Sequence, residues 1–190
     1  AMLMGVPRHP KAFVITDAAV NIAPDLDAKR DIVQNAIDLM RALGVATPKV
    51  ALLAAIETVN PKMPATVDAA ALCKMAERGQ ITGGVLDGPL AFDNAISAEA
   101  ARIKGICSPV AGDPDILLAP TLEAGNLLYK QLVYLSDAFA AGVVLGAKVP
   151  VILTSRADTA AAHRFSAAAA ALYANALVHD PAILLPETEE

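Results

Sequence analysis

The sequence predicts an α/β fold in which a largely parallel sheet carries helices on both faces. Short apolar runs alternate along the chain with longer segments in which apolar residues recur at helical spacing. The short runs are continuously apolar, as expected of strands that are buried on both faces. Of the 190 residues, 55% are hydrophobic and 18% are charged, which suits a well-packed core and excludes a disordered chain.

The predicted strands are the five short apolar runs. Each is separated from the next by a segment with helical spacing, and a strand, a helix and a further strand in succession typically form a parallel unit. The five runs are residues 12–16, 49–54, 81–86, 115–119 and 149–154.

The predicted helices are bounded by residues that favour helix ends. Ile32, Val33 and Ala36 begin the apolar face of the first helix, and Gly44 follows it as a C-terminal cap would. Ser97 caps a short helix in the middle of the chain. The longer helices are expected over residues 25–43, 66–79, 122–141 and 159–178, and the polar tail 186–190 is expected to fray.

Composition excludes several classes of function. The net charge is −5 and no run of Lys and Arg occurs, which argues against a nucleic-acid partner. The most apolar segment, residues 165–178, is too short for a membrane span, and the N-terminus does not have the pattern of a signal peptide. The apolar fraction is high for one small domain, so we expect a homodimer.

The cysteines and histidines do not predict a metal site. Cys73 and Cys107 are expected to be buried free thiols, which suits a cytoplasmic protein, with a disulfide as the alternative. His9, His163 and His179 lack the spacing of metal ligands.

Ligands of parallel α/β sheets collect beyond the carboxyl ends of the strands. Polar residues and glycines concentrate in the segments at these positions, and the first of them ends at Asn21, a candidate ligand-binding residue. The segments are residues 17–21, 57–60, 87–93, 120–126 and 155–158.

Ser155, Arg156 and Asp158 follow an apolar run and open the last predicted helix. The first amides of a helix have no partners within it, and Arg156 adds a full positive charge, so this segment suits an anion such as phosphate. The alternative is that Asp158 caps the helix and Arg156 forms a surface ion pair.

Gly125, Asn126 and Lys130 lie near the start of another predicted helix. Asn126 and Lys130 are four residues apart and share a helix face, where an amide and an ammonium group could hold a phosphate. Gly125 would let a ligand approach the backbone. The alternative is a solvated face with a glycine that packing requires.

Asp87 and Asp93 flank a Gly-Pro turn. Paired carboxylates suit acid–base catalysis or a metal ion. Turns also favour Asp, Gly and Pro for backbone reasons alone, which is the alternative.

Five blocks in order resemble the phosphate acetyl/butyryltransferase family. Together they extend over roughly residues 12–178, and although each is weakly specific, five in order are specific. The blocks are residues 16–21, 87–96, 108–112, 120–130 and 153–156.

The resemblance implies two α/β domains of the isocitrate/isopropylmalate dehydrogenase-like, three-layer type, with the active site in the cleft between them. It divides this chain into residues 1–11, a linker or remnant of the first domain; 12–150, the second domain; and 151–190, which return toward the first domain. The chain would then be a C-terminal part of the enzyme, with little activity of its own.

The resemblance also implies a reaction, in which acyl-CoA and phosphate give acyl phosphate and coenzyme A. Coenzyme A is a substrate, no cofactor is tightly bound, and the acyl group is acetyl or butyryl. Ser155 would position the thiol and Arg156 the phosphate. Some members have a general-base Asp seven residues after this Ser; that position is Ala162 here, which leaves Asp158 nearby.

The same residues leave two alternatives to this reaction open. Related domains serve as non-catalytic oligomerisation or effector-binding modules of larger enzymes, but such modules tend to lose the Ser-Arg pair and the 87–93 loop, which this chain keeps. A dehydrogenase of the related fold would need a metal-binding aspartate cluster, which the sequence lacks.

Overall fold

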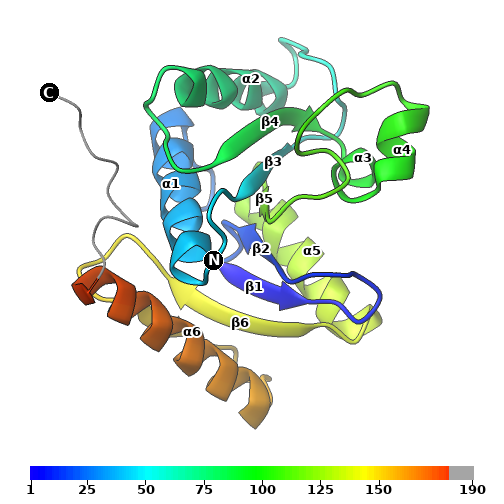
Figure 1. Cartoon of the computed structure of the whole chain (residues 1–190). Helices are drawn as coiled ribbons and strands as arrows, with labels where there is room; N and C mark the ends of the chain where they lie inside the picture. The colour runs from blue at the N-terminus through cyan, green and yellow to red at the C-terminus, as the bar shows by residue number, and fades with distance from the viewer. Residues whose placement is uncertain (180–190) are drawn as a thin grey trace, which may run out of the picture.

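A computed structural model describes residues 1–179 of the chain, in which one seven-stranded mixed sheet lies between two layers of helices (Figure 1). The strand order is β4-β3-β5-β2-β1-β6-β7. The expected α/β sheet with helices on both faces is confirmed. The expectation of a largely parallel sheet holds for only half of it, because the three strands at one end pair antiparallel. The predicted frayed tail lies outside the described residues.

The parallel half contains β4, β3, β5 and β2, all running in one direction. Their side chains alternate between the two faces of the sheet: Val14 packs into the core on one face and Ile15 into the core on the other. Apolar runs buried on both faces were the basis for predicting these strands. Their bounds are β2 Phe13–Thr16, β3 Lys49–Leu53, β4 Val85–Leu90 and β5 Ile116–Leu118.

Strand β4 begins later than the predicted strand over residues 81–86. Gly83 has a φ of +77°, and a Cβ at Gly84 would lie 2.9 Å from the carbonyl oxygen of Pro48. A turn therefore occupies the start of the predicted run, and the β3–β4 ladder begins at Val85. As a consequence Asp87 lies within the strand instead of in the loop after it.

The antiparallel half contains β1 Met2–Gly5, β6 Phe139–Val144 and β7 Val151–Leu153. Of these, only β7 falls in a run that the sequence predicts. Residues 139–141 were expected at the end of a helix, but α5 ends at Leu135, and Asp137 turns the chain with a φ of 52°. Small residues such as Ala140 and Ala141 have no apolar period that would distinguish a strand from a helix.

The helices cover the two faces as two separate packing groups. One face packs against α1 Leu26–Ala42, α2 Pro64–Glu77 and α6 Ala160–His179, and the other against α3 Phe92–Ile96 and α5 Leu122–Leu135. The short α4, Ala98–Ile103, follows α3. Figure 1 shows α2 along β4 at one end of the sheet and α6 along β6 at the other.

Side-chain caps explain where three of these helices begin. Asp25, Ser97 and Thr121 each accept a hydrogen bond from the backbone N–H three residues later, at the starts of α1, α4 and α5. The start of α2 is two residues earlier than predicted because Pro64 occupies its first turn, where a missing N–H costs nothing.

Both cysteines are free thiols, as predicted. The prediction of burial is wrong for Cys107, which is exposed, and Cys73 is only half-buried. No helix among residues 1–179 is both long and apolar enough to cross a membrane.

Candidate functional site

A pocket of about 340 Å³ lies between α5, the start of β6 and the N-terminal half of α6. It brings together Ser155 and Asp158 from the loop after β7 with Lys130 from α5, which the sequence analysis had named separately. Its wall also includes Tyr129 and Ala162. The pocket therefore combines a cation, hydroxyl groups and carboxylates with an apolar wall.

The Ser155–Asp158 loop is a tight turn that is closed at both ends. Asp158 accepts a hydrogen bond from the Ser155 N–H at 2.6 Å, and its own N–H donates to the Ser155 carbonyl at 3.1 Å. The alternative in which Asp158 caps the helix is wrong, because the hydroxyl of Thr159 accepts from Ala162 at the start of α6. Asp158 instead holds the backbone of Ser155 in place.

Arg156 is exposed and does not line this pocket. Within residues 1–179 it forms no ion pair, so the alternative of a surface ion-pair partner is not seen there. Its guanidinium group extends from the same turn that positions Ser155, and its role in binding phosphate stays a prediction.

Lys130 and Asn126 share a face of α5 but make different contacts. Lys130 lines the pocket, whereas the Asn126 side-chain amide donates to the Ala18 carbonyl at 3.0 Å. A Cβ at Gly125 would lie 2.3 Å from the Asp17 carbonyl oxygen, so a glycine is needed for α5 to pack against this loop. Asn126 and Gly125 thus fix the position of α5, and with it that of Lys130.

Asn21 belongs to a loop that Asp17 organises. The Asp17 carboxylate accepts from the N–H groups of Ala19, Val20 and Asn21, and from the Asn21 side chain at 2.7 Å. Burial raises the pKa of Asp17, but these hydrogen bonds outweigh burial, so its pKa lies below the ordinary value. Asp17 and Asn21 line a separate pocket of about 220 Å³ beside α1.

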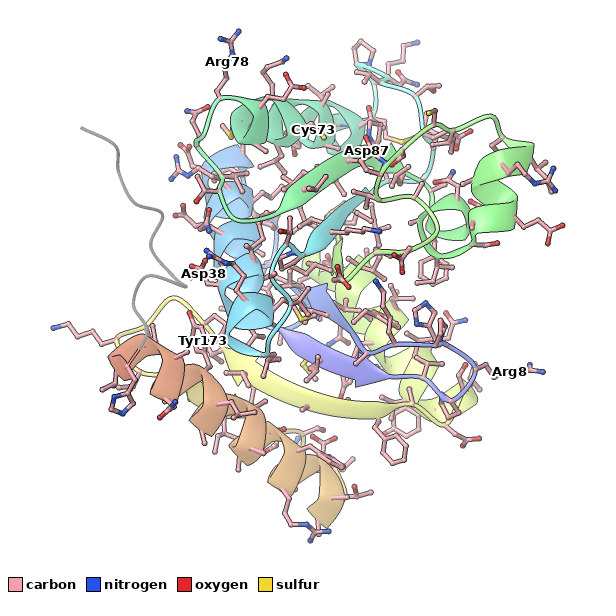
Figure 2. The ribbon with its side chains drawn as sticks, in the orientation of Figure 1. Arg8, Asp38, Cys73, Arg78, Asp87 and Tyr173 are labelled. Carbon is pink, nitrogen blue, oxygen red and sulfur yellow. The ribbon has the colours of Figure 1, made fainter. Side chains whose placement is uncertain are left out.

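Asp87 and Asp93 lie toward the β4 edge of the sheet and do not line the Ser155 pocket. Figure 2 shows Asp87 near Cys73, where β4 passes α2, and burial together with the Asp87 charge raises the pKa of Cys73 to about 11. Asp93 forms an ion pair with Lys104 at 2.9 Å. The structure does not bring these carboxylates together with Ser155, and their role in binding substrate stays a prediction.

Several residues that line the pocket were not identified from the sequence. They lie in or beside the turn between α5 and β6, which the sequence analysis had placed inside a long helix, and on the first turns of α6. Burial raises the pKa of Tyr129, and the nearby Asp158 raises it further. The aromatic rings of Phe139 and Phe165 meet edge to face, 6.3 Å apart. The residues concerned are Tyr129, Val133, Tyr134, Asp137, Ala138, Phe139, Ala140 and Phe165.

Comparison with known proteins relates the chain to one family. A family model described as Phosphate acetyl/butaryl transferase matches residues 1–171. The chain is 66% identical to a phosphate acetyltransferase of Rhizobium meliloti over 172 residues, which are 90% of this chain and 54% of that relative. It is 51% identical to a phosphate butyryltransferase of Clostridium acetobutylicum over 167 residues, which are 88% of this chain and 56% of that relative.

A solved structure is also similar in fold. A branched-chain phosphotransacylase from Enterococcus faecalis V583 superposes with a TM-score of 0.83 at 39% identity, over 91% of this chain and 62% of that one. The chain therefore spans about half the length of the curated relatives it matches.

Proposed function

The chain belongs to the Phosphate acetyl/butaryl transferase family, and from this premise we propose that it takes part in transferring an acetyl or butyryl group between coenzyme A and inorganic phosphate. The observation that carries the proposal is the pocket in which Ser155, held by its turn, lies together with Lys130. Coenzyme A acts as a substrate, and the reaction needs no tightly bound cofactor.

The pocket contains part of the chemistry that such a transfer needs. In the direction that forms the thioester, the thiol of coenzyme A loses its proton and its sulfur bonds to the carbonyl carbon of the acyl phosphate. The bond from that carbon to the phosphate oxygen breaks, and phosphate leaves with the electron pair. Lys130 supplies positive charge for the phosphate in a chain whose net charge is −5, and Arg156, on the turn that carries Ser155, would add a second positive charge from outside the pocket lining. Ser155 orients the thiol.

The remaining half of the active site comes from a first domain that lies across a cleft, in the three-layer arrangement of the isocitrate/isopropylmalate dehydrogenase-like fold. Large apolar side chains are exposed on α6 and on the strands next to it, and a partner domain would cover them. The exposed side chains on these elements include Phe139, Val151, Phe165, Leu172 and Val178. In this division residues 12–150 belong to the second domain and residues 151–190 return to the first.

A hybrid enzyme tests the proposed function. In the hybrid, this chain replaces the matching segment of the Rhizobium meliloti phosphate acetyltransferase, which supplies the half that the chain does not span. We expect the hybrid to consume acetyl-CoA or butyryl-CoA and release free thiol only when phosphate is present, whereas the 190-residue chain alone should show little turnover. An inactive hybrid that folds would favour the alternative of a non-catalytic oligomerisation or effector-binding module.

We further propose that the protein is a cytoplasmic homodimer. The unpaired cysteines suit a reducing compartment, and exposed apolar side chains also occur away from α6, for example Val67 on α2 and Ile103 on α4. Light scattering on the hybrid at micromolar concentration should give twice the mass of one chain, and the mass of a single chain would contradict the dimer.

A further inference from the structure

Asp137 has a left-handed backbone conformation, which is uncommon among residues other than glycine. Its φ of 52° is the only positive value at a non-glycine residue within residues 1–179. It lies in the turn after α5, where the Ala138 N–H donates to the Leu132 carbonyl at 3.2 Å. This position most often holds glycine, and asparagine and aspartate are among the other residues that adopt the left-handed conformation most readily. A role beyond ending the helix therefore depends on what the Asp137 side chain faces.

Asp137 also lines the pocket that contains Ser155 and Lys130. Strained residues are concentrated at functional sites, where the surrounding structure holds them in place. No side chain within residues 1–179 forms a hydrogen bond or an ion pair with the Asp137 carboxylate. The carboxylate is exposed and available to a ligand in the pocket.

The other carboxylate of the pocket already has a structural task. Asp158 accepts a short hydrogen bond of 2.6 Å from the Ser155 N–H, which holds the turn closed. The α6 side of the pocket presents Ala162 and Phe165, neither of which can accept a proton. Asp137 is thus the carboxylate of the pocket that no structural contact within the described residues engages.

We propose that Asp137 accepts the proton of the coenzyme A thiol during acyl transfer. A free thiol has a pKa of about 8.5, so at neutral pH it is mostly protonated and a poor nucleophile until a base removes the proton. The proton moves from sulfur to the Asp137 carboxylate as the carbon–sulfur bond forms and the phosphate leaves. This role rests on the proposed function, and it gives a use to the carboxylate of the pocket that makes no structural contact within the described residues.

Two substitutions separate a catalytic role from a structural one. Asp137→Asn keeps the size of the side chain and tolerates a positive φ, and Asp137→Gly removes the backbone strain altogether. If Asp137 is only a helix-end residue, both variants should keep their activity, and the glycine variant should melt at the same temperature or higher. If it accepts the proton, both should fold at least as well and yet lose activity.

In the hybrid enzyme we expect kcat for thioester formation from acetyl phosphate and coenzyme A to fall about 10²–10⁴-fold in both variants. In both variants the fall in rate at low pH, the acidic limb of the pH–rate profile, should disappear, because the carboxylate that becomes protonated there is gone. Asp158→Asn serves as the discriminating variant: it should lower the rate less and leave the acidic limb in place. Glu99→Gln, which removes an exposed carboxylate on α4, is the control and should match the unmodified hybrid.

The outcomes separate the two proposals. A hybrid with no phosphate-dependent transfer overturns the proposed function and this role with it. If the hybrid is active and Asp137→Asn stays within about twofold of it, only the role of Asp137 is overturned. Loss of the acidic limb in Asp158→Asn, but not in Asp137→Asn, would assign the proton to Asp158.

Discussion

The two ends of the sheet differ in how completely their strands are buried. In the parallel half, Ile116 of β5 is fully buried, whereas Ile152 of β7, at the far edge, is 49% exposed. The buried half supports the sheet, and the open half carries the pocket with Ser155, Lys130 and Asp137. The parallel half thus stabilises the fold but contributes little to the pocket. The antiparallel half contributes most of the pocket, and its apolar side chains are partly exposed in this chain.

The largest expected effect is on stability and depends on which half is changed. Ile116→Ala should lower the free energy of unfolding by about 2–5 kcal/mol, because it leaves a cavity between two helical layers. Ile152→Ala, the same change at the exposed edge, should cost well under half as much. Urea unfolding of the two variants measures the difference, and equal losses would mean that the two halves are equally packed.

Arg156→Ala tests the contribution of the antiparallel half to enzymatic activity. In the hybrid enzyme we expect kcat/KM for phosphate or acyl phosphate to fall about 10²–10³-fold, since one preorganised charge contact to the anion is lost. The melting temperature should not change, because Arg156 is exposed. Wild-type kinetics in a folded variant would show that Arg156 does not contact the anion.

Gly125→Ala should affect the junction of the two halves. The added Cβ would lie 2.3 Å from the Asp17 carbonyl oxygen, so α5 must move away from the loop after β2, at a cost of about 1–3 kcal/mol. Gly5→Ala is the matched control. Its added Cβ would lie 3.9 Å from the nearest atom, an ordinary van der Waals contact, so this substitution should be tolerated. In the hybrid enzyme a shift of α5 should also weaken substrate binding through Lys130.

The smallest expected effect is on the pH dependence of stability, and it arises at the contact between α1 and α6. Figure 2 shows Asp38 on α1 and Tyr173 on α6 where these helices approach each other. Burial raises the pKa of Asp38 to about 6, although Gln34 donates a hydrogen bond to it and Arg41 is near. Burial also raises the pKa of Tyr173 to about 12, and the Asp38 charge contributes.

A raised carboxyl pKa means that the folded state binds a proton more tightly than the unfolded state. The contribution of Asp38 to stability is therefore most favourable below its ordinary pKa of about 4 and declines as the pH rises to about 6. Asp38→Asn should remove this decline and stabilise the chain at pH 7 by on the order of 1 kcal/mol. Thermal unfolding of both proteins at pH 5 and pH 7 measures this effect. If Asp38→Asn loses as much stability between pH 5 and pH 7 as the unmodified chain does, the assignment to Asp38 is contradicted.

The parallel strands β2, β3 and β5 and the starts of the longer helices could be predicted from the sequence alone, whereas β4 overlaps its predicted run only at residues 85 and 86. Continuous apolar runs and caps such as Asp25, Ser97 and Thr121 act within a few residues, so they can be read locally. The five motif blocks likewise indicated the family to which the chain belongs.

The antiparallel half and the composition of the pocket were decided by tertiary structure. The run of small residues in β6 has no helical or strand period, and its position depends on pairing with β1 on one side and β7 on the other. A Cβ at Gly142 would lie 2.2 Å from the Leu153 carbonyl oxygen, a requirement that only this pairing creates. Asp137 joins Ser155 in one pocket because α5 ends early and the chain turns back into the sheet, and residues so far apart in sequence meet only through the fold.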